Sequence, residues 1–410
     1  MTAAPGSTGV GTTAGDGGSA GDTRADETGE TGGSPDSGSA HRSCQEDEGV
    51  IQAIPAGFDN YAAEGFDRYA EVIAPNGLPI RIFAQDQVSD LMIHRARNLL
   101  RFYLADVAGS MYGADKDDVA NFMADNEAVL AMPNGAHTEG NEPNVPAQPL
   151  YQDEAPVDGS AWYLDNDYEH RDAALEEIFH LVHDTGIGTN IPGARPKYQA
   201  LLDAEARASI EDGRWAIPID PGVARWIEEL DAEGSLAQEY IASVIDSYYG
   251  LWGAFDEPGG MWGIYIAKTR AEVYRLDAPG AALLEHFLPP YLDYEARLDP
   301  TLTGTFAMRF DPAVPYTHKS QYLLQATLTG TNDSSLLGNA GDNTLRGNAG
   351  NNRLDGGDGQ DTAVFCGSRG DYTVSVDGKE ITVSGPDGND TLVSVEWVHF
   401  GDGLVATSDL

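Results

Sequence analysis

A nine-residue repeat near the end of the chain constrains the fold more than any other feature. Residues 338–346 read Gly-Asn-Ala-Gly-Asp-Asn-Thr-Leu-Arg, residues 347–355 and 356–364 repeat the pattern, and a degenerate copy spans 329–337. Each of the three clear copies has glycine at positions one and four, Asn or Asp at position six, and an apolar residue at position eight. Glycine permits tight turns in which backbone carbonyls point inward. A flexible glycine-rich linker would not keep three copies in register.

The repeat matches the G-G-x-G-x-D-x-U-x pattern of a parallel β-roll, in which the turns bind calcium. Alternate turns face each other on one side of such a roll, so we expect Asn343 and Asp361 to share an ion. Asn343 and Asn352 stand where the pattern has aspartate, which predicts few ions and weaker binding. The residues expected at the calcium sites are Gly338, Ala340, Asn343, Asn352, Gly356, Asp358 and Asp361.

The segment from about 326 to 410, with its trailing runs 371–374 and 390–400, resembles the C-terminal RTX calcium-binding module of serralysin-type secreted proteins. This resemblance implies export by a one-step type I secretion apparatus, which reads an uncleaved C-terminal signal. It also implies an extracellular location and folding on contact with external calcium. Residues 1–6 show no basic and apolar segments of an N-terminal secretory signal, as this route would predict.

Composition excludes several classes of partner. The net charge of −42 argues against nucleic acid and anionic membrane surfaces and suits a calcium-rich exterior. No run of about 18 apolar residues is present, so we expect no membrane insertion. Residues 1–45 contain almost no large apolar side chains and are expected to form a disordered tail. Cys44 and Cys366 form no metal-binding pattern, and whether they pair stays open; we expect a monomer.

The segment 174–186 predicts a helix that carries a polar stripe. Glu176, His180 and His183 fall at i, i+4 and i+7, and apolar residues occupy the neighbouring face. Side chains at i and i+4 lie about 5–6 Å apart at Cβ, close enough to bind one metal ion. His183 could be a further ligand, a supporting residue or an ordinary surface histidine. In a chain this acidic, glutamates on a solvated helix face could also produce the pattern.

The run Glu176-Glu177-Ile178-Phe179-His180 resembles the H-E-x-x-H helix of zincin metallopeptidases, with the first histidine replaced by glutamate. The resemblance implies that Glu176 and His180 bind the metal, that Glu177 is the general base, and that a glutamate on a later helix is the third ligand. The extra carboxylate makes manganese, iron or calcium more plausible occupants than in a site with two histidines, beside zinc itself.

Residues 235–238, Ser-Leu-Ala-Gln, are a capping-box signature and predict a second helix that ends near Tyr249. This helix carries Glu239, Ser243 and Asp246 along one polar stripe. By the resemblance, Glu239 is the third metal ligand and Asp246 is a candidate supporting partner. Glu239 taken alone fits equally well as an ordinary carboxylate in the first turn of a helix.

Together these features predict an α+β chain, with a mostly helical zincin-like lobe at 46–325 and a C-terminal parallel β-roll with the secretion module at 326–410. The expected function is that of a secreted calcium-binding protein whose metal-dependent lobe hydrolyses protein or peptide substrates. A non-catalytic extracellular adhesin or a degenerate peptidase is the first alternative. A polysaccharide-acting enzyme is the second, because RTX modules accompany many catalytic domains.

Overall fold

A computed structural model describes residues 50–410 of the chain except Glu139 and Asn190. These residues belong to one compact unit, Ser43–Leu410. The disordered tail expected at residues 1–45 lies outside the described residues, as does Cys44. Cys366 is disulfide-bonded.

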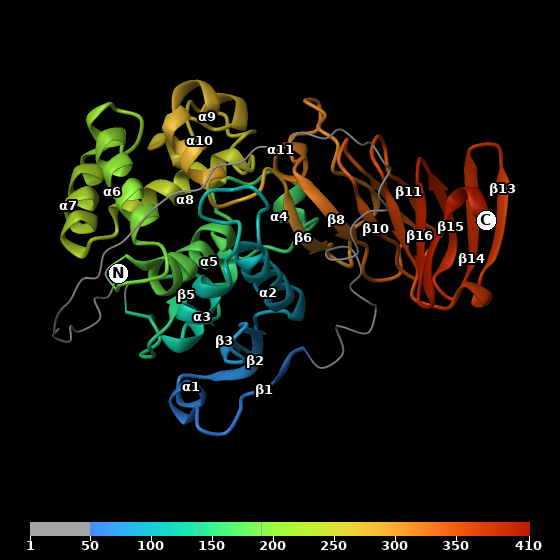
Figure 1. Ribbon diagram of the computed structural model, residues 1–410, viewed down its shortest axis with the longest axis horizontal. Helices are drawn as coiled ribbons and strands as arrows, with labels where there is room; N and C mark the ends of the chain where they lie inside the picture. Colours follow the sequence, from blue (N-terminus) through green and yellow to red (C-terminus); the bar gives the residue numbers. More distant parts are fainter. Residues whose placement is uncertain (1–49, 139, 190) are drawn as a thin grey trace, which may run out of the picture. The chain divides into compact units, whose positions relative to one another are not determined.

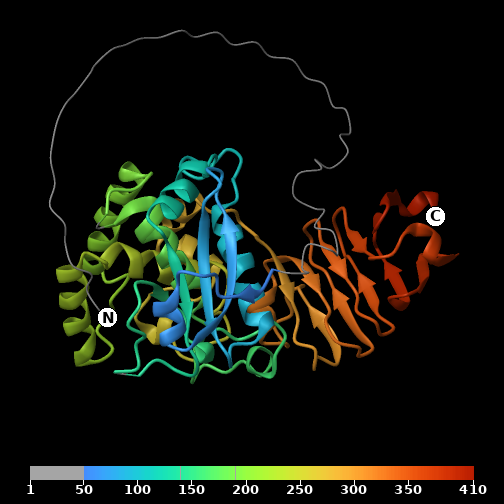
Figure 2. The ribbon, with the colours of Figure 1, turned by 90° about the horizontal axis from the view of Figure 1, so that it is seen from below.

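A mixed sheet forms one side of the N-terminal lobe. Its central strand β3 pairs antiparallel with β2 and parallel with β4. The alternation of β-branched and aromatic residues in Pro79–Gln85, where Ile80, Ile82 and Phe83 are fully buried, explains why this segment is a strand. Figure 2 shows the sheet in blue and teal among the helices of the lobe. The strands lie in the order β1 (Gln52–Ala53), β2 (Phe66–Ile73), β3 (Pro79–Gln85), β4 (Val129–Met132) and β5 (Gln148–Pro149).

Helices make up most of the rest of the lobe, and α5 lies among them in contact with both α2 and α8 (Figure 1). Helix α2 is capped at its N-terminus, because Ser89 Oγ accepts a hydrogen bond from Met92 N. The helices are α1 (Asp59–Ala63), α2 (Asp90–Leu104), α3 (Asp117–Asp125), α4 (Ala161–Leu164), α5 (Ala174–Val182), α6 (Pro196–Glu211), α7 (Pro221–Glu233), α8 (Leu236–Tyr248), α9 (Arg270–Leu276), α10 (Ala278–Glu285) and α11 (Thr317–Ser320).

The C-terminal part consists of two six-stranded sheets, and the strands of the repeat alternate between them. The predicted α+β class with a strand-rich C-terminal part is confirmed. One sheet has the order β17 (Gly403–Ala406), β16 (Trp397–Phe400), β12 (Thr362–Val364), β10 (Thr344–Arg346), β8 (Leu323–Thr327), β6 (Leu292–Arg297). The other has the order β13 (Thr373–Asp377), β14 (Glu380–Gly385), β15 (Gly388–Val393), β11 (Arg353–Asp355), β9 (Ser334–Leu337), β7 (Gly304–Ala307).

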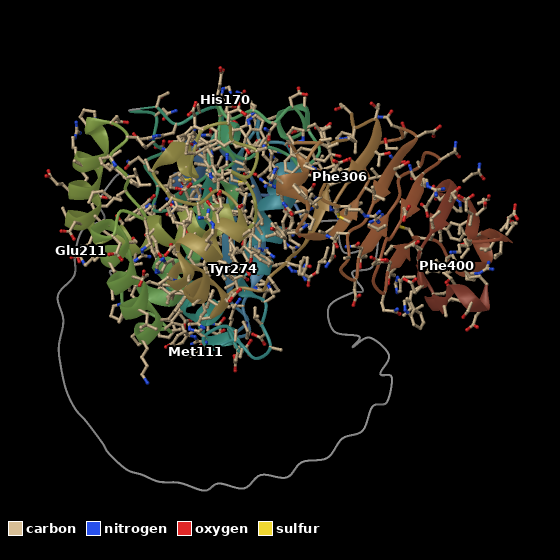
Figure 3. All side chains as sticks on the ribbon, turned by 90° about the horizontal axis from the view of Figure 1, so that it is seen from above. Met111, His170, Glu211, Tyr274, Phe306 and Phe400 are labelled. Atoms are coloured by element: carbon tan, nitrogen blue, oxygen red, sulfur yellow. The ribbon has the colours of Figure 1, made fainter. Side chains whose placement is uncertain are left out.

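The eighth residues of the repeats form the core between these two sheets, as the pattern predicts. Leu336, Leu345, Leu354 and Ala363 are all buried, and the strands that carry them pair in parallel with their neighbours in the same sheet. In Figure 3 the labelled Phe306, from β7, also lies among the strands of the roll. Buried residues of the lobe and of the roll belong to one continuous hydrophobic cluster.

Candidate metal centre

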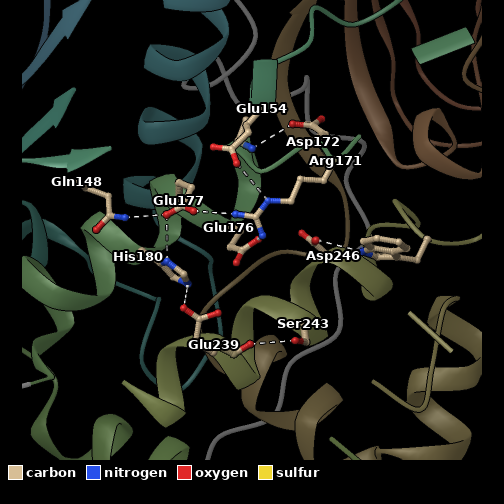
Figure 4. Close-up of polar contacts among 12 residues, drawn as sticks. Gln148, Glu154, Arg171, Asp172, Glu176, Glu177, His180, Glu239, Ser243 and Asp246 are labelled. Carbon is tan, nitrogen blue, oxygen red and sulfur yellow. Dashed lines mark hydrogen bonds and ion pairs between the residues drawn. The ribbon is translucent and has the colours of Figure 1, made fainter. Parts of the chain in front are cut away.

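Two helices bring three ligand-type side chains together in the lobe. Glu176 and His180 lie one turn apart on α5, and each is only 3% exposed. Helix α8 packs against α5 and presents Glu239 to the same point (Figure 4). One ligand atom from each of Glu176, His180 and Glu239 lies within 4.8 Å of the other two. The structure thus brings together the three side chains that the helical spacing and the downstream glutamate predicted as ligands.

His180 has one engaged and one unpaired ring nitrogen. Its Nδ1 lies 3.3 Å from Glu177 Oε2, and its Nε2 lies 3.9 Å from Glu239 Oε1. Nε2 is buried and has no hydrogen-bond partner among the described residues. Burial alone lowers the pKa of His180, but the charges of Glu239, Glu177 and Glu176 outweigh it and raise that pKa to about 10. A cation that bound here would therefore have to displace a proton.

Glu239 lies in the first turn of α8. Its side chain is 19% exposed, and burial raises the pKa of its carboxyl to about 7. The helix begins where the sequence predicted, but the predicted capping box is wrong, because Ser235 accepts no capping hydrogen bond. Gly234 ends α7 in the left-handed conformation, and the Ser235 hydroxyl faces Leu230 O at 3.4 Å instead. The short connection between the helices thus leaves Ser235 outside the extended conformation that an N-cap requires.

Glu177 is held by three neighbours. Gln148 Nε2 donates to its Oε2 at 2.7 Å, and Arg171 Nη2 donates to its Oε1 at 2.9 Å. Arg171 Nη1 also donates to Glu176 Oε2 at 2.8 Å, so one guanidinium bridges both glutamates of α5. Burial by itself raises the pKa of Glu177, but the His180 hydrogen bond and the positive charges of His180 and Arg171 bring it below its ordinary value. Sequence reasoning did not single out Arg171.

His183 does not join the cluster. His183 directly follows α5 and its own backbone is still α-helical, but its ring contacts α6 and not Glu176 or His180; the π-helical turn His183–Gly188 begins at this residue. The ring is fully buried, its Nε2 lies 2.5 Å from Gln199 Oε1 on α6, and burial lowers its pKa to about 4. Full burial rules out the ordinary surface histidine considered for this position, and His183 lies outside the group of three residues whose ligand atoms come within 4.8 Å of one another.

Asp246 is buried on α8, two turns beyond Glu239. Its Oδ2 accepts a hydrogen bond from Trp252 Nε1 at 3.3 Å, and its Oδ1 has no partner among the described residues. Burial raises the pKa of this carboxyl well above its ordinary value, and the charge of Glu176 adds to the effect. Among the described residues, Asp246 therefore forms no hydrogen bond with Glu176, His180 or Glu239.

The residues predicted to bind calcium differ in their burial and in their hydrogen-bond partners. Asn343 N donates to Asp361 Oδ1 at 2.8 Å, so these two residues face each other on one side of the roll; that they share an ion stays a prediction. The other oxygen, Asp361 Oδ2, is buried without a hydrogen-bond partner. A Cβ at Gly356 would lie 2.3 Å from this oxygen and 2.4 Å from Ser394 O, so only glycine fits there. Gly338 is also buried, whereas Ala340 and Asp358 are exposed.

The two asparagines at position six close their own turns. Asn343 Oδ1 accepts from Asn339 N, and its Nδ2 donates to Asn339 Oδ1 at 3.1 Å. Asn352 makes the same two contacts with Asn348. The side-chain amides of Asn343 and Asn352 thus donate hydrogen bonds to oxygen atoms that could otherwise bind a cation. The sequence prediction missed Asp390, whose Oδ1 accepts from Asn352 N at 2.8 Å and whose Oδ2 is unpaired like that of Asp361. A signal was present in the Asp390–Leu392 run, where Asp stands two residues before Leu as in the repeat.

Comparison with known proteins identifies a family for the repeats of the roll and for no other part of the chain. The family model of the RTX calcium-binding nonapeptide repeat, with four copies, matches residues 329–363. These include the degenerate copy at 329–337. Repeats of this family bind calcium and are typical of proteins secreted by the type I route. No curated protein matches the chain significantly. Within the described residues, no helix is long and apolar enough to cross a membrane.

Proposed function

We propose that the lobe binds one divalent transition metal through Glu176, His180 and Glu239. The observation that carries this proposal is the approach of the three ligand atoms to within 4.8 Å of one another, together with the unpaired Nε2 of His180. One imidazole and two carboxylates form a ligand set suited to zinc or manganese. A buried nitrogen without a hydrogen bond is also the atom that a metal would satisfy.

We further propose that the lobe is a zincin-like, metal-dependent peptidase in a calcium-folded protein secreted by the type I route. A metal of this kind supplies Lewis acidity toward a carbonyl oxygen. Glu177, beside the ligands, is the residue able to accept a proton from the attacking water. Gln148 and Arg171 fix the orientation of its carboxylate, and both ligating helices are buried, which keeps the group in one geometry.

A second function is favoured by Arg171. Its guanidinium and the His180 ring lower the pKa of Glu177, and a carboxylate with a low pKa is a weak proton acceptor. This arrangement fits a degenerate peptidase that retains a metal for structure and acts as an extracellular binding protein. The two functions share the metal site and differ in whether Glu177 works as a base.

Metal analysis tests the shared part. Full-length protein folded in calcium should retain about one zinc or manganese ion per chain. His180→Ala and Glu239→Ala should both lose it. The matched controls His137→Ala and Glu229→Ala change exposed side chains, 44% and 41% accessible, and should retain the metal. Calcium alone, with equal content in every variant, would refute the metal site.

Activity separates the two functions. A peptidase should cleave casein and leave a panel of glycans intact, and Glu177→Gln should reduce cleavage about a hundredfold or more while keeping the metal. A loaded protein that cleaves nothing would support the non-catalytic alternative. Cleavage of a glycan instead would identify a polysaccharide-acting enzyme.

A further inference from the structure

Arg171 is the cation that contacts the carboxylates of the proposed site most directly. Its Nη1 donates to Glu176 Oε2 at 2.8 Å, its Nη2 to Glu177 Oε1 at 2.9 Å, and its Nε lies 3.8 Å from Glu154 Oε1 (Figure 4). The side chain is only 23% exposed, so solvent screens these interactions weakly. A partly buried arginine in this position needs a reason, because the ligands themselves do not require it.

Charge supplies the first part of that reason. A site with Glu176, Glu239 and a neutral His180 carries two negative charges, whereas a site with two histidines and one glutamate carries one. Arg171, which donates a hydrogen bond directly to Glu176, offsets one of these two charges. The three ligands and Arg171 together thus carry the same net charge as the ligands of a two-histidine site, although two of these ligands are carboxylates.

Free oxygen atoms supply the second part. Calcium takes six to eight oxygen ligands and readily uses both oxygens of a carboxylate, whereas zinc is satisfied by four ligands that include nitrogen. Arg171 engages one oxygen of Glu176, and Gln148 and Arg171 engage the two oxygens of Glu177. The contacts therefore leave few oxygens for a large cation, while His180 Nε2 remains free for a metal that binds nitrogen.

The roll makes this discrimination necessary. Its repeats belong to a calcium-binding family, so we expect the protein to work where calcium is present. A site of two carboxylates without compensation would then be exposed to calcium at the concentration that folds the roll. We propose that Arg171 is the specificity-determining residue that keeps calcium out of the Glu176–His180–Glu239 site. This inference rests on the proposed metal site.

Cobalt provides a probe that distinguishes the two kinds of site. Cobalt(II) takes zinc-like ligand sets and absorbs visible light when nitrogen and oxygen ligands surround it. The signal of the lobe is the absorption that disappears in His180→Ala. Calcium is titrated into the cobalt-loaded, full-length protein, and the concentration that displaces half of this signal is measured. In the wild type, the calcium concentration that folds the roll should displace almost none of it.

Variants at position 171 test the cause. In Arg171→Gln, half-displacement should occur at a calcium concentration lower by about tenfold or more, because a neighbouring positive charge is gone. Arg171→Lys keeps the charge and should stay within about threefold of the wild type. Arg225→Gln, which changes an exposed arginine of α7, is the matched control and should behave as the wild type. In a Glu176→His background, which removes one carboxylate, Arg171→Gln should have a much smaller effect.

Each outcome bears on a different claim. A wild type that binds no cobalt in the lobe refutes the metal site and this inference with it. A wild type whose cobalt is displaced by the calcium that folds the roll overturns the role of Arg171 alone, even if no variant folds. The same follows if Arg171→Gln resists calcium as the wild type does, or if it retains its near-ultraviolet circular dichroism but binds no cobalt, since Arg171 would then only position Glu176.

Discussion

Position six of the repeat, and the matching position at Asp390 beyond it, carry two kinds of side chain, asparagine and aspartate. At Asn343 and Asn352 the amide donates to a neighbouring asparagine and completes its own turn. At Asp361 and Asp390 one oxygen accepts a backbone hydrogen bond and the other has no partner. A buried carboxylate oxygen without a partner is costly unless a proton or a cation satisfies it. We therefore expect calcium to bind chiefly at the turns that carry the two aspartates.

The pH dependence of the roll follows from these two residues. Burial raises the pKa of both carboxyls to about 7, above about 3.9 for an ordinary aspartate. The calcium-free fold therefore binds protons more tightly than the unfolded chain, so its stability should fall as pH rises from about 4 to about 7. Calcium binds the ionised form of these carboxyls. The calcium concentration at which half of the protein is folded should therefore rise by about tenfold when the pH is lowered from 8 to 6. Circular dichroism during calcium titration measures both effects.

Two variants decide whether these aspartates are responsible. Asp361→Asn combined with Asp390→Asn should remove both pH trends and weaken calcium binding. Asp377→Asn, on exposed strand β13, should change neither. A double variant that keeps the wild-type pH profile would mean that other carboxylates of the roll bind the ion.

At the scale of elements, local pattern predicted more than long-range pairing did. The periodicity of 174–186 predicted a helix, of which 174–182 form α5, and the run 235–238 predicted the start of α8, so both ligand-bearing helices could be placed from sequence. The π-helical turn after Val182 could not, because nothing local in that segment signals a change of helical pitch. Strands β6 and β7 were also missed. Each is a short segment that becomes a strand by pairing with β8 or β9, about 30 residues later in the sequence.

The buried, stacked leucines of the repeat should contribute more to the stability of the roll than its surface leucines do. Leu354 on β11 is fully buried, and replacing it by alanine leaves a cavity, so Leu354→Ala should reduce the free energy of unfolding by about 2–5 kcal/mol. Leu404 on β17 is 37% exposed, and Leu404→Ala should cost about 1 kcal/mol or less. Urea unfolding at saturating calcium measures the difference. Equal losses in both variants would show that the leucine column is not the core of the roll.

At the scale of the whole molecule, the lobe and the roll are connected by packing and hydrogen bonds as well as by the polypeptide chain. Strand β6 belongs to a sheet of the roll and packs against α2 of the lobe, while Tyr294 OH on β6 donates to buried Asp158 at 3.0 Å. Lys319, just before β8, lies 4.5 Å from the ring of Trp162 and 4.9 Å from that of Tyr168. Such contacts are invisible in the sequence because their members are far apart along it. They couple the calcium sites physically to the lobe.

This continuity predicts that calcium binding in the roll stabilises the lobe. An ion that binds only the folded form at 100 times its Kd adds about 2.7 kcal/mol per site, and a shared core passes that gain to the whole unit. Heating in calcium should therefore give one transition, seen alike by Trp215, which is buried in the lobe, and by strand content. Asp361→Asn should lower the midpoint of both signals together, without a chelator that would also strip the metal from the lobe. Two transitions, with the Trp215 midpoint unmoved in the variant, would mean that lobe and roll unfold independently and that calcium serves the roll alone.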